Sequence, residues 1–60
     1  MKVQTAYNNI YEEYGQEMAN AFFEELKKWD QTMSNSSLML SFYDRDVLQR
    51  MLNYAKDKKS

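Results

Sequence analysis

Residues 3–33, VQTAYNNIYEEYGQEMANAFFEELKKWDQTM, decide the fold of this 60-residue chain. Large apolar side chains recur along this stretch at spacings of three and four, which is the period of an α-helix with one face against a core. The stripe consists of Val3, Tyr7, Ile10, Tyr14, Met18, Phe22, Leu26, Trp29 and Met33. We therefore expect a long first helix over about residues 4–31.

Gly15, the single glycine of the chain, lies inside this stretch at the point where the apolar stripe begins to drift around the helix axis. Glycine in a helix interior costs about 1 kcal/mol relative to alanine. One interpretation keeps the helix continuous and explains Gly15 by the close crossing of a second helix. The alternative breaks the helix at Gly15, which gives three short helices in place of two.

A second helical unit follows residues 32–37, TMSNSS, whose serine and asparagine residues favour turns and caps. Helical spacing continues through Val47, Leu48, Met51, Leu52, Tyr54 and Ala55. The stretch Leu38–Tyr43 suits either a helix or a short extended segment, and helix is favoured because no partner strand is visible. We expect a second helix over about residues 38–58, and therefore an all-α helical hairpin in a single domain, residues 1–60.

The size of the chain predicts a homodimer. A chain this short buries only about 60% of its unfolded surface, and without Cys no disulfide can compensate. Two hairpins that join in a four-helix bundle would bury the remaining apolar surface. The expected seam sets Tyr7, Ile10, Tyr14, Met18, Phe22 and Trp29 against Leu40, Val47, Leu48, Met51, Leu52 and Tyr54.

The composition argues against catalysis. The chain has no His and no Cys, so its serines lack an imidazole base and the usual zinc ligands are missing. Glu13, Glu17 and Glu24 share a helical face, but carboxylate metal sites in helical bundles normally add a Glu-x-x-His motif. We therefore expect no enzyme, no cofactor and no bound metal.

Phe23 is the strongest indication of a protein partner, because it points about 150° away from the centre of the apolar stripe at 100° per residue. Such a residue on a polar face, together with five methionines, indicates either a dimer seam or a binding surface for a different protein. The expected contacts are Phe23, Trp29, Met33, Leu38 and Phe42, with Glu13, Glu17 and Glu24 as a polar rim. The resulting hypothesis is a small non-enzymatic regulator that binds and inhibits a larger protein.

The alternative hypothesis is a small DNA-binding regulator. Side chains that suit base edges and phosphates follow one another along the second helix. They are Arg45, Gln49, Arg50, Asn53 and Lys56. Asp44 and Asp46 at the start of that helix, a net charge of −1 and a pI of about 5.2 count against this alternative.

No run of about 18 apolar residues could cross a membrane, and the first residues lack the apolar core of a signal peptide. We therefore expect a cytoplasmic protein without a membrane partner. The frequent use of Asn, Lys, Tyr and Met is typical of AT-rich genomes, which favours a phage- or plasmid-encoded, viral-type protein.

Overall fold

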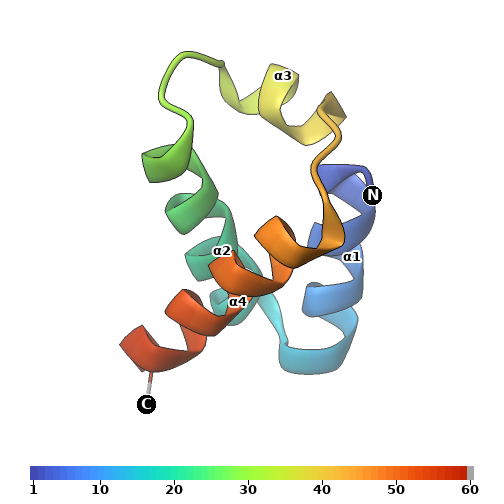
Figure 1. Cartoon of the computed structure of the whole chain (residues 1–60). Helices are drawn as coiled ribbons and strands as arrows, with labels where there is room; N and C mark the ends of the chain where they lie inside the picture. The colour runs from blue at the N-terminus through green and yellow to red at the C-terminus, as the bar shows by residue number, and fades with distance from the viewer. Residues whose placement is uncertain (60) are drawn as a thin grey trace.

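The computed structural model describes residues 1–59, which form four α-helices joined by short connections (Figure 1). The helices are α1 (Val3–Tyr14), α2 (Gln16–Trp29), α3 (Asn35–Leu40) and α4 (Arg45–Lys59). α2 packs against both α1 and α4, and α3 packs against α1. The prediction of an all-α fold is confirmed, and α2 is its central element. No described helix has both the length and the apolar character that a membrane crossing requires.

Gly15 separates α1 from α2 with backbone angles of φ 99° and ψ 176°. This region of φ/ψ space is essentially open only to glycine. Apart from Gly15 and its two chain neighbours, no described atom lies within 4 Å of the position that a Cβ at residue 15 would take, so a close crossing does not explain the glycine. The prediction of one continuous helix over residues 4–31 is therefore wrong. The break at Gly15 that the alternative proposed is confirmed, but the described residues form four helices rather than three.

The prediction of a single second helix over residues 38–58 is also wrong, because the chain is extended between α3 and α4. Ser34 caps α3, its hydroxyl accepting a hydrogen bond from Ser37 N at 3.3 Å. α3 ends at Leu40, and the following residues pair with the start of the chain. Lys2 and Phe42 form an antiparallel bridge there.

Backbone hydrogen bonds hold this pairing on both sides of the bridge. Val3 N donates to Ser41 O at 2.9 Å, and Tyr43 N donates to Met1 O at 3.0 Å. The pairing partner that the sequence did not reveal is the start of the chain, where Lys2 forms the bridge. The ambiguous stretch 38–43 is therefore helical up to residue 40 and extended after it.

The hydrophobic core draws on all four helices. The buried side chains are Val3, Ala6, Ile10, Ala19, Ala21, Phe22, Leu26, Leu38, Leu48, Met51, Leu52 and Ala55. Four residues of the expected seam, Tyr14, Trp29, Leu40 and Tyr54, are exposed instead. The break at Gly15 redirects the chain, so the two halves of the apolar stripe do not follow one straight line. The core closes within one chain, and dimerisation stays a prediction.

Candidate functional site

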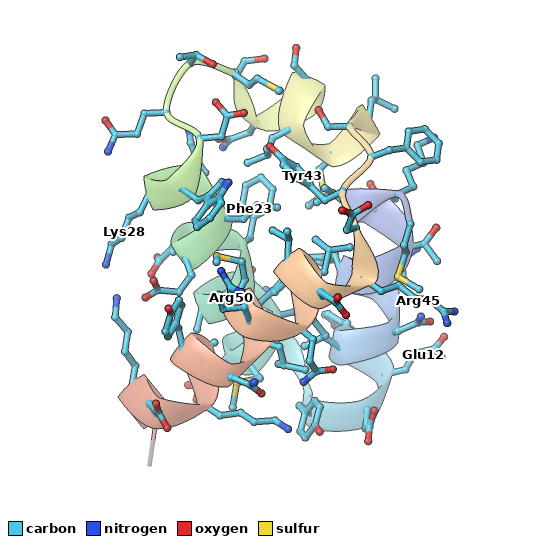
Figure 2. The ribbon with its side chains drawn as sticks, viewed as in Figure 1. Glu12, Phe23, Lys28, Tyr43, Arg45 and Arg50 are labelled. Atoms are coloured by element: carbon cyan, nitrogen blue, oxygen red, sulfur yellow. The ribbon has the colours of Figure 1, made fainter. Side chains whose placement is uncertain are left out.

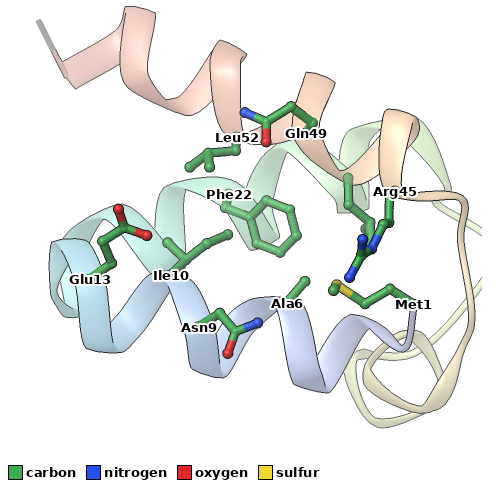
Figure 3. Close-up of a pocket in the computed structure, with 10 residues that line it drawn as sticks. Met1, Ala6, Asn9, Ile10, Glu13, Phe22, Arg45, Gln49 and Leu52 are labelled. Carbon is green, nitrogen blue, oxygen red and sulfur yellow. The ribbon is translucent and has the colours of Figure 1, made fainter.

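A groove of about 320 Å³ lies between α1 and α4 (Figure 3). α1 and α4 both pack on α2 but have little direct contact with each other, which leaves this space open. Its lining comes from the chain start and from α1, α2 and α4. The lining residues are Met1, Ala6, Asn9, Ile10, Glu13, Phe22, Arg45, Leu48, Gln49 and Leu52.

The floor of the groove is part of the hydrophobic core. Phe22 from α2 is fully buried, and Ile10, Leu48 and Leu52 are each less than one-tenth exposed. Core packing therefore fixes these side chains before any ligand arrives. Phe22 lies beneath the accessible surface, so a ligand would meet the small exposed edges of Ile10, Leu48 and Leu52, which need no further ordering.

Charged residues mark the two ends of the groove. Glu13, in the last turn of α1, lies at one end, and Arg45, the first residue of α4, lies at the other (Figure 3). The sides carry the polar, exposed Asn9 and Gln49. Both α1 and α4 begin at the Arg45 end. The groove thus has an apolar floor, polar sides and two ends of opposite charge.

Two of the expected partner contacts are not where the sequence analysis placed them. Leu38 is fully buried because α3 packs against α1, so it offers no surface to a partner and that prediction is wrong. Phe23 is half-buried and packs edge-on against the ring of Tyr7, with the ring centres 6.3 Å apart. The polar face expected around Phe23 is occupied by α1.

The other three expected contacts do not form one surface with the groove. Trp29 is 54% exposed and lines a separate hollow of about 230 Å³ beside Tyr54. Phe42 is 74% exposed in the segment that pairs with the chain start. Met33 is half-buried, and its sulfur accepts a hydrogen bond from the Ser41 hydroxyl at 3.0 Å.

The expected acidic rim is divided between two places. Glu13 lies in the groove, whereas Glu17 and Glu24 line a hollow beside Lys58 on the α2–α4 side. Within residues 1–59, no group of three or more acidic side chains is arranged to hold a metal ion. The acids therefore do not act as a single cluster in this fold.

The candidate nucleic-acid residues all lie on α4, and Arg45, Gln49, Arg50 and Asn53 are exposed. Arg45 and Arg50 point away from α4 in different directions (Figure 2). Gln49 Nε2 donates to Asn53 Oδ1 at 3.1 Å. Since Arg45 and Gln49 also line the groove, only part of the predicted basic face remains separate from it.

Lys56, the last candidate nucleic-acid residue, is partly buried and has a partner within the chain. Its Nζ lies 4.9 Å from the centre of the Tyr14 ring, within the range of a cation–π contact. This contact joins α4 to the end of α1. A phosphate at Lys56 would have to compete with it.

Comparisons of this chain with protein-family models, curated proteins and solved structures gave no match. The functional argument therefore depends on the geometry of the site. The α1–α4 groove combines an apolar floor with charged ends, and it is therefore the candidate binding site.

Proposed function

We propose that this chain is a small non-enzymatic regulator that binds a larger protein in the cytoplasm and inhibits it. The observation that supports this proposal is the groove between α1 and α4, whose floor presents the apolar edges of Ile10, Leu48 and Leu52. Protein interfaces typically combine an apolar centre with a polar rim. Asn9 and Gln49 would supply that rim here.

Large apolar side chains that are exposed outside the groove also support a function in protein binding. Exposed large side chains outside the groove floor include Trp29, Leu40, Phe42 and Tyr54, each between 48% and 74% accessible. Single exposed apolar residues are ordinary, but this is a large share for a chain of 60 residues. Some of these residues would extend the interface beyond the groove.

Affinity capture with two tryptophan variants tests the proposal. Asn9→Trp places a bulky ring at the side of the groove, and Asn8→Trp places the same ring on the neighbouring exposed position outside it. We expect a stoichiometric protein from a host lysate to bind the wild type and Asn8→Trp after nuclease treatment. Binding to Asn9→Trp should fall at least tenfold. The absence of any nuclease-resistant partner contradicts the proposal.

DNA binding through α4 is the second candidate function, and the exposure of Arg45, Gln49, Arg50 and Asn53 favours it. Recovery that depends wholly on nucleic acid would support this candidate over the first. Its affinity should fall steeply with salt, because each phosphate contact releases counterions. An interface anchored by apolar side chains responds weakly to salt, so a salt titration of the recovered complex separates the two functions.

A homodimer is a further arrangement that the exposed apolar residues support. It would cover Trp29 and Tyr54, which lie beside the same hollow. Sedimentation of the wild type over a range of concentrations tests it directly. Dissociation of a dimer by Trp29→Ala would place the dimer seam at that hollow.

A further inference from the structure

We propose that the occupant of the α1–α4 groove is one amphipathic α-helix of the partner protein. This helix runs antiparallel to α1 and α4, with its N-terminus at Glu13 and its C-terminus at Arg45. The inference depends on the proposed function and adds the structural class and the direction of the partner segment.

The walls of the groove favour a helix over an extended peptide. Strand addition needs an open sheet edge with free backbone donors and acceptors. The walls here are helices, whose interior backbone groups are already hydrogen-bonded. Recognition must therefore come from side chains that enter the groove from a regular, convex element. A helix with apolar residues on one face meets this requirement.

The length of the groove also fits a short stretch of helix. α1 and α4 flank the space and α2 lies behind it, so an element bound there would run along both α1 and α4 (Figure 3). Along α1, the groove extends from Ala6 to Glu13, which is about 10 Å at 1.5 Å per residue. About two turns of a partner helix fit this length, with anchors at i, i+3 or i+4, and i+7.

The charges at the ends select one direction for the bound helix. A helix carries partial positive charge at its N-terminus and partial negative charge at its C-terminus. The Glu13 carboxylate therefore favours the N-terminus, and the Arg45 guanidinium favours the C-terminus. The reverse direction would place like charges together at both ends.

A second copy of this chain is a poorer occupant than a partner helix. Two copies related by a twofold axis would present one concave groove to another, and neither would fill the other. The charges alone would permit this pairing, since Glu13 of each copy would face Arg45 of the other. Shape decides against it, because a concave groove needs a convex element to fill it.

The test uses a displayed library of peptides about 14 residues long, with Leu at helical spacing and acetylated and amidated ends. Peptides selected on the wild-type chain should bind Asn9→Trp at least tenfold more weakly and Asn8→Trp equally well. Their binding should shift the backbone amide resonances of Ala6, Ile10 and Leu52. Equal binding to both variants, or selection of no helical peptide, overturns the inference.

A nitroxide at either end of a selected peptide reports the direction. An N-terminal label should broaden the amide resonances around Glu13, and a C-terminal label those around Arg45. Glu13→Lys should weaken binding by about two- to tenfold, and the adjacent Glu12→Lys should leave it unchanged. The opposite broadening pattern, or equal effects of the two lysine variants, overturns the proposed direction.

Separate outcomes distinguish failure of this inference from failure of the proposed function. A captured protein that binds Asn9→Trp as well as the wild type supports the function and overturns the groove as its site. Helical peptides that bind the groove, with no protein captured, support the inference and contradict the function. A dimer that Asn9→Trp dissociates overturns the partner helix in favour of a second copy.

Discussion

The phenolic oxygen of Tyr43 donates a hydrogen bond to Asp30 Oδ2 at 3.0 Å. Asp30 directly follows α2, and Tyr43 lies in the extended segment before α4, so this bond joins the end of α2 to the chain that leads into α4. The same carboxylate also accepts hydrogen bonds from the backbone and hydroxyl of Thr32. Tyr43 thus helps to fix the start of α4, and with it the Arg45 end of the groove.

This contact predicts how stability depends on pH. Hydrogen bonds from the Thr32 hydroxyl and Tyr43 lower the pKa of Asp30 from 3.8, so its contribution is complete above about pH 4 and is lost as the pH falls. Burial, and then the bond to Asp30, raise the pKa of Tyr43 above 10.0. The contribution of Tyr43 is therefore complete below about pH 10 and is lost as the pH rises further.

Tyr43→Phe should flatten the alkaline decline in stability and weaken the acid decline. Urea unfolding followed by circular dichroism, at pH values from about 2.5 to 11, measures both. Tyr54→Phe is the matched control, because Tyr54 is about half exposed and lies outside this contact. An alkaline decline that Tyr43→Phe leaves unchanged would show that another group controls it.

Gly15→Ala should destabilise the fold by about 1–3 kcal/mol through the backbone alone. The φ of 99° is strained for an L-residue, although there is open space for the added methyl group. D-alanine accepts positive φ, so a synthetic chain with D-alanine in place of Gly15 should be as stable as the wild type or more stable. Chemical denaturation of both chains measures the difference. Equal stability of the L- and D-alanine chains would refute the backbone explanation.

Much of the helical pattern could be read from the sequence, and the errors have local physical causes. Helical spacing identified α1, α2 and most of α4, but spacing alone does not show that Gly15 adopts a backbone that ends one helix and begins another. The extended residues after Leu40 were missed because their pairing partner is the chain start, 40 residues away in sequence. Nonlocal pairing of this kind leaves no periodic signal.

The candidate site was harder to predict than the fold. Glu13, Arg45 and Gln49 were singled out for other reasons, and the groove brings them together. Ile10 and Phe22 were expected in a core seam, and they form groove floor because α1 and α4 diverge above α2. That divergence follows from the break at Gly15, so the groove could not be predicted while the helix was taken as continuous.

Two leucine variants test the core assignment directly. Leu48→Ala removes a side chain that is only 4% exposed and should cost about 2–5 kcal/mol. Leu40→Ala makes the same chemical change at a side chain that is 63% exposed, and it should alter stability by less than about 0.5 kcal/mol. Thermal unfolding compares the two. Similar losses would mean that Leu40 is buried in solution, as it would be if a dimer covered it.

Phe22→Ala should be the most damaging single truncation, at about 3–5 kcal/mol, because Phe22 is fully buried and also floors the groove. For a chain of this size, such a loss approaches the whole stability of the fold. Phe42→Ala is the matched control at a side chain that is 74% exposed. A small loss at Phe22 would contradict the burial described here.

The last turn of α4 depends on an ion pair, and its removal should loosen that turn alone. Lys58 Nζ lies 2.6 Å from Glu25 Oε1, and this ion pair is the main reason that the pKa of Glu25 is lowered. Ala55 is the last buried residue among those described up to Lys58, so polar and ionic contacts rather than apolar packing hold the end of α4. Glu25→Gln should therefore speed amide hydrogen exchange at residues 56–58 while residues 45–52 stay protected.

A neighbouring lysine supplies the matched control for this ion pair. Lys28→Gln removes the longer 3.7 Å contact to the same Glu25 carboxylate and should have a smaller effect on exchange. High salt should reproduce part of the change in the wild type, because Lys28 and Lys58 are both about half exposed and their charges are screened. Unchanged exchange in Glu25→Gln would show that this end of α4 is held by packing, since the ion pair would then contribute nothing to its protection.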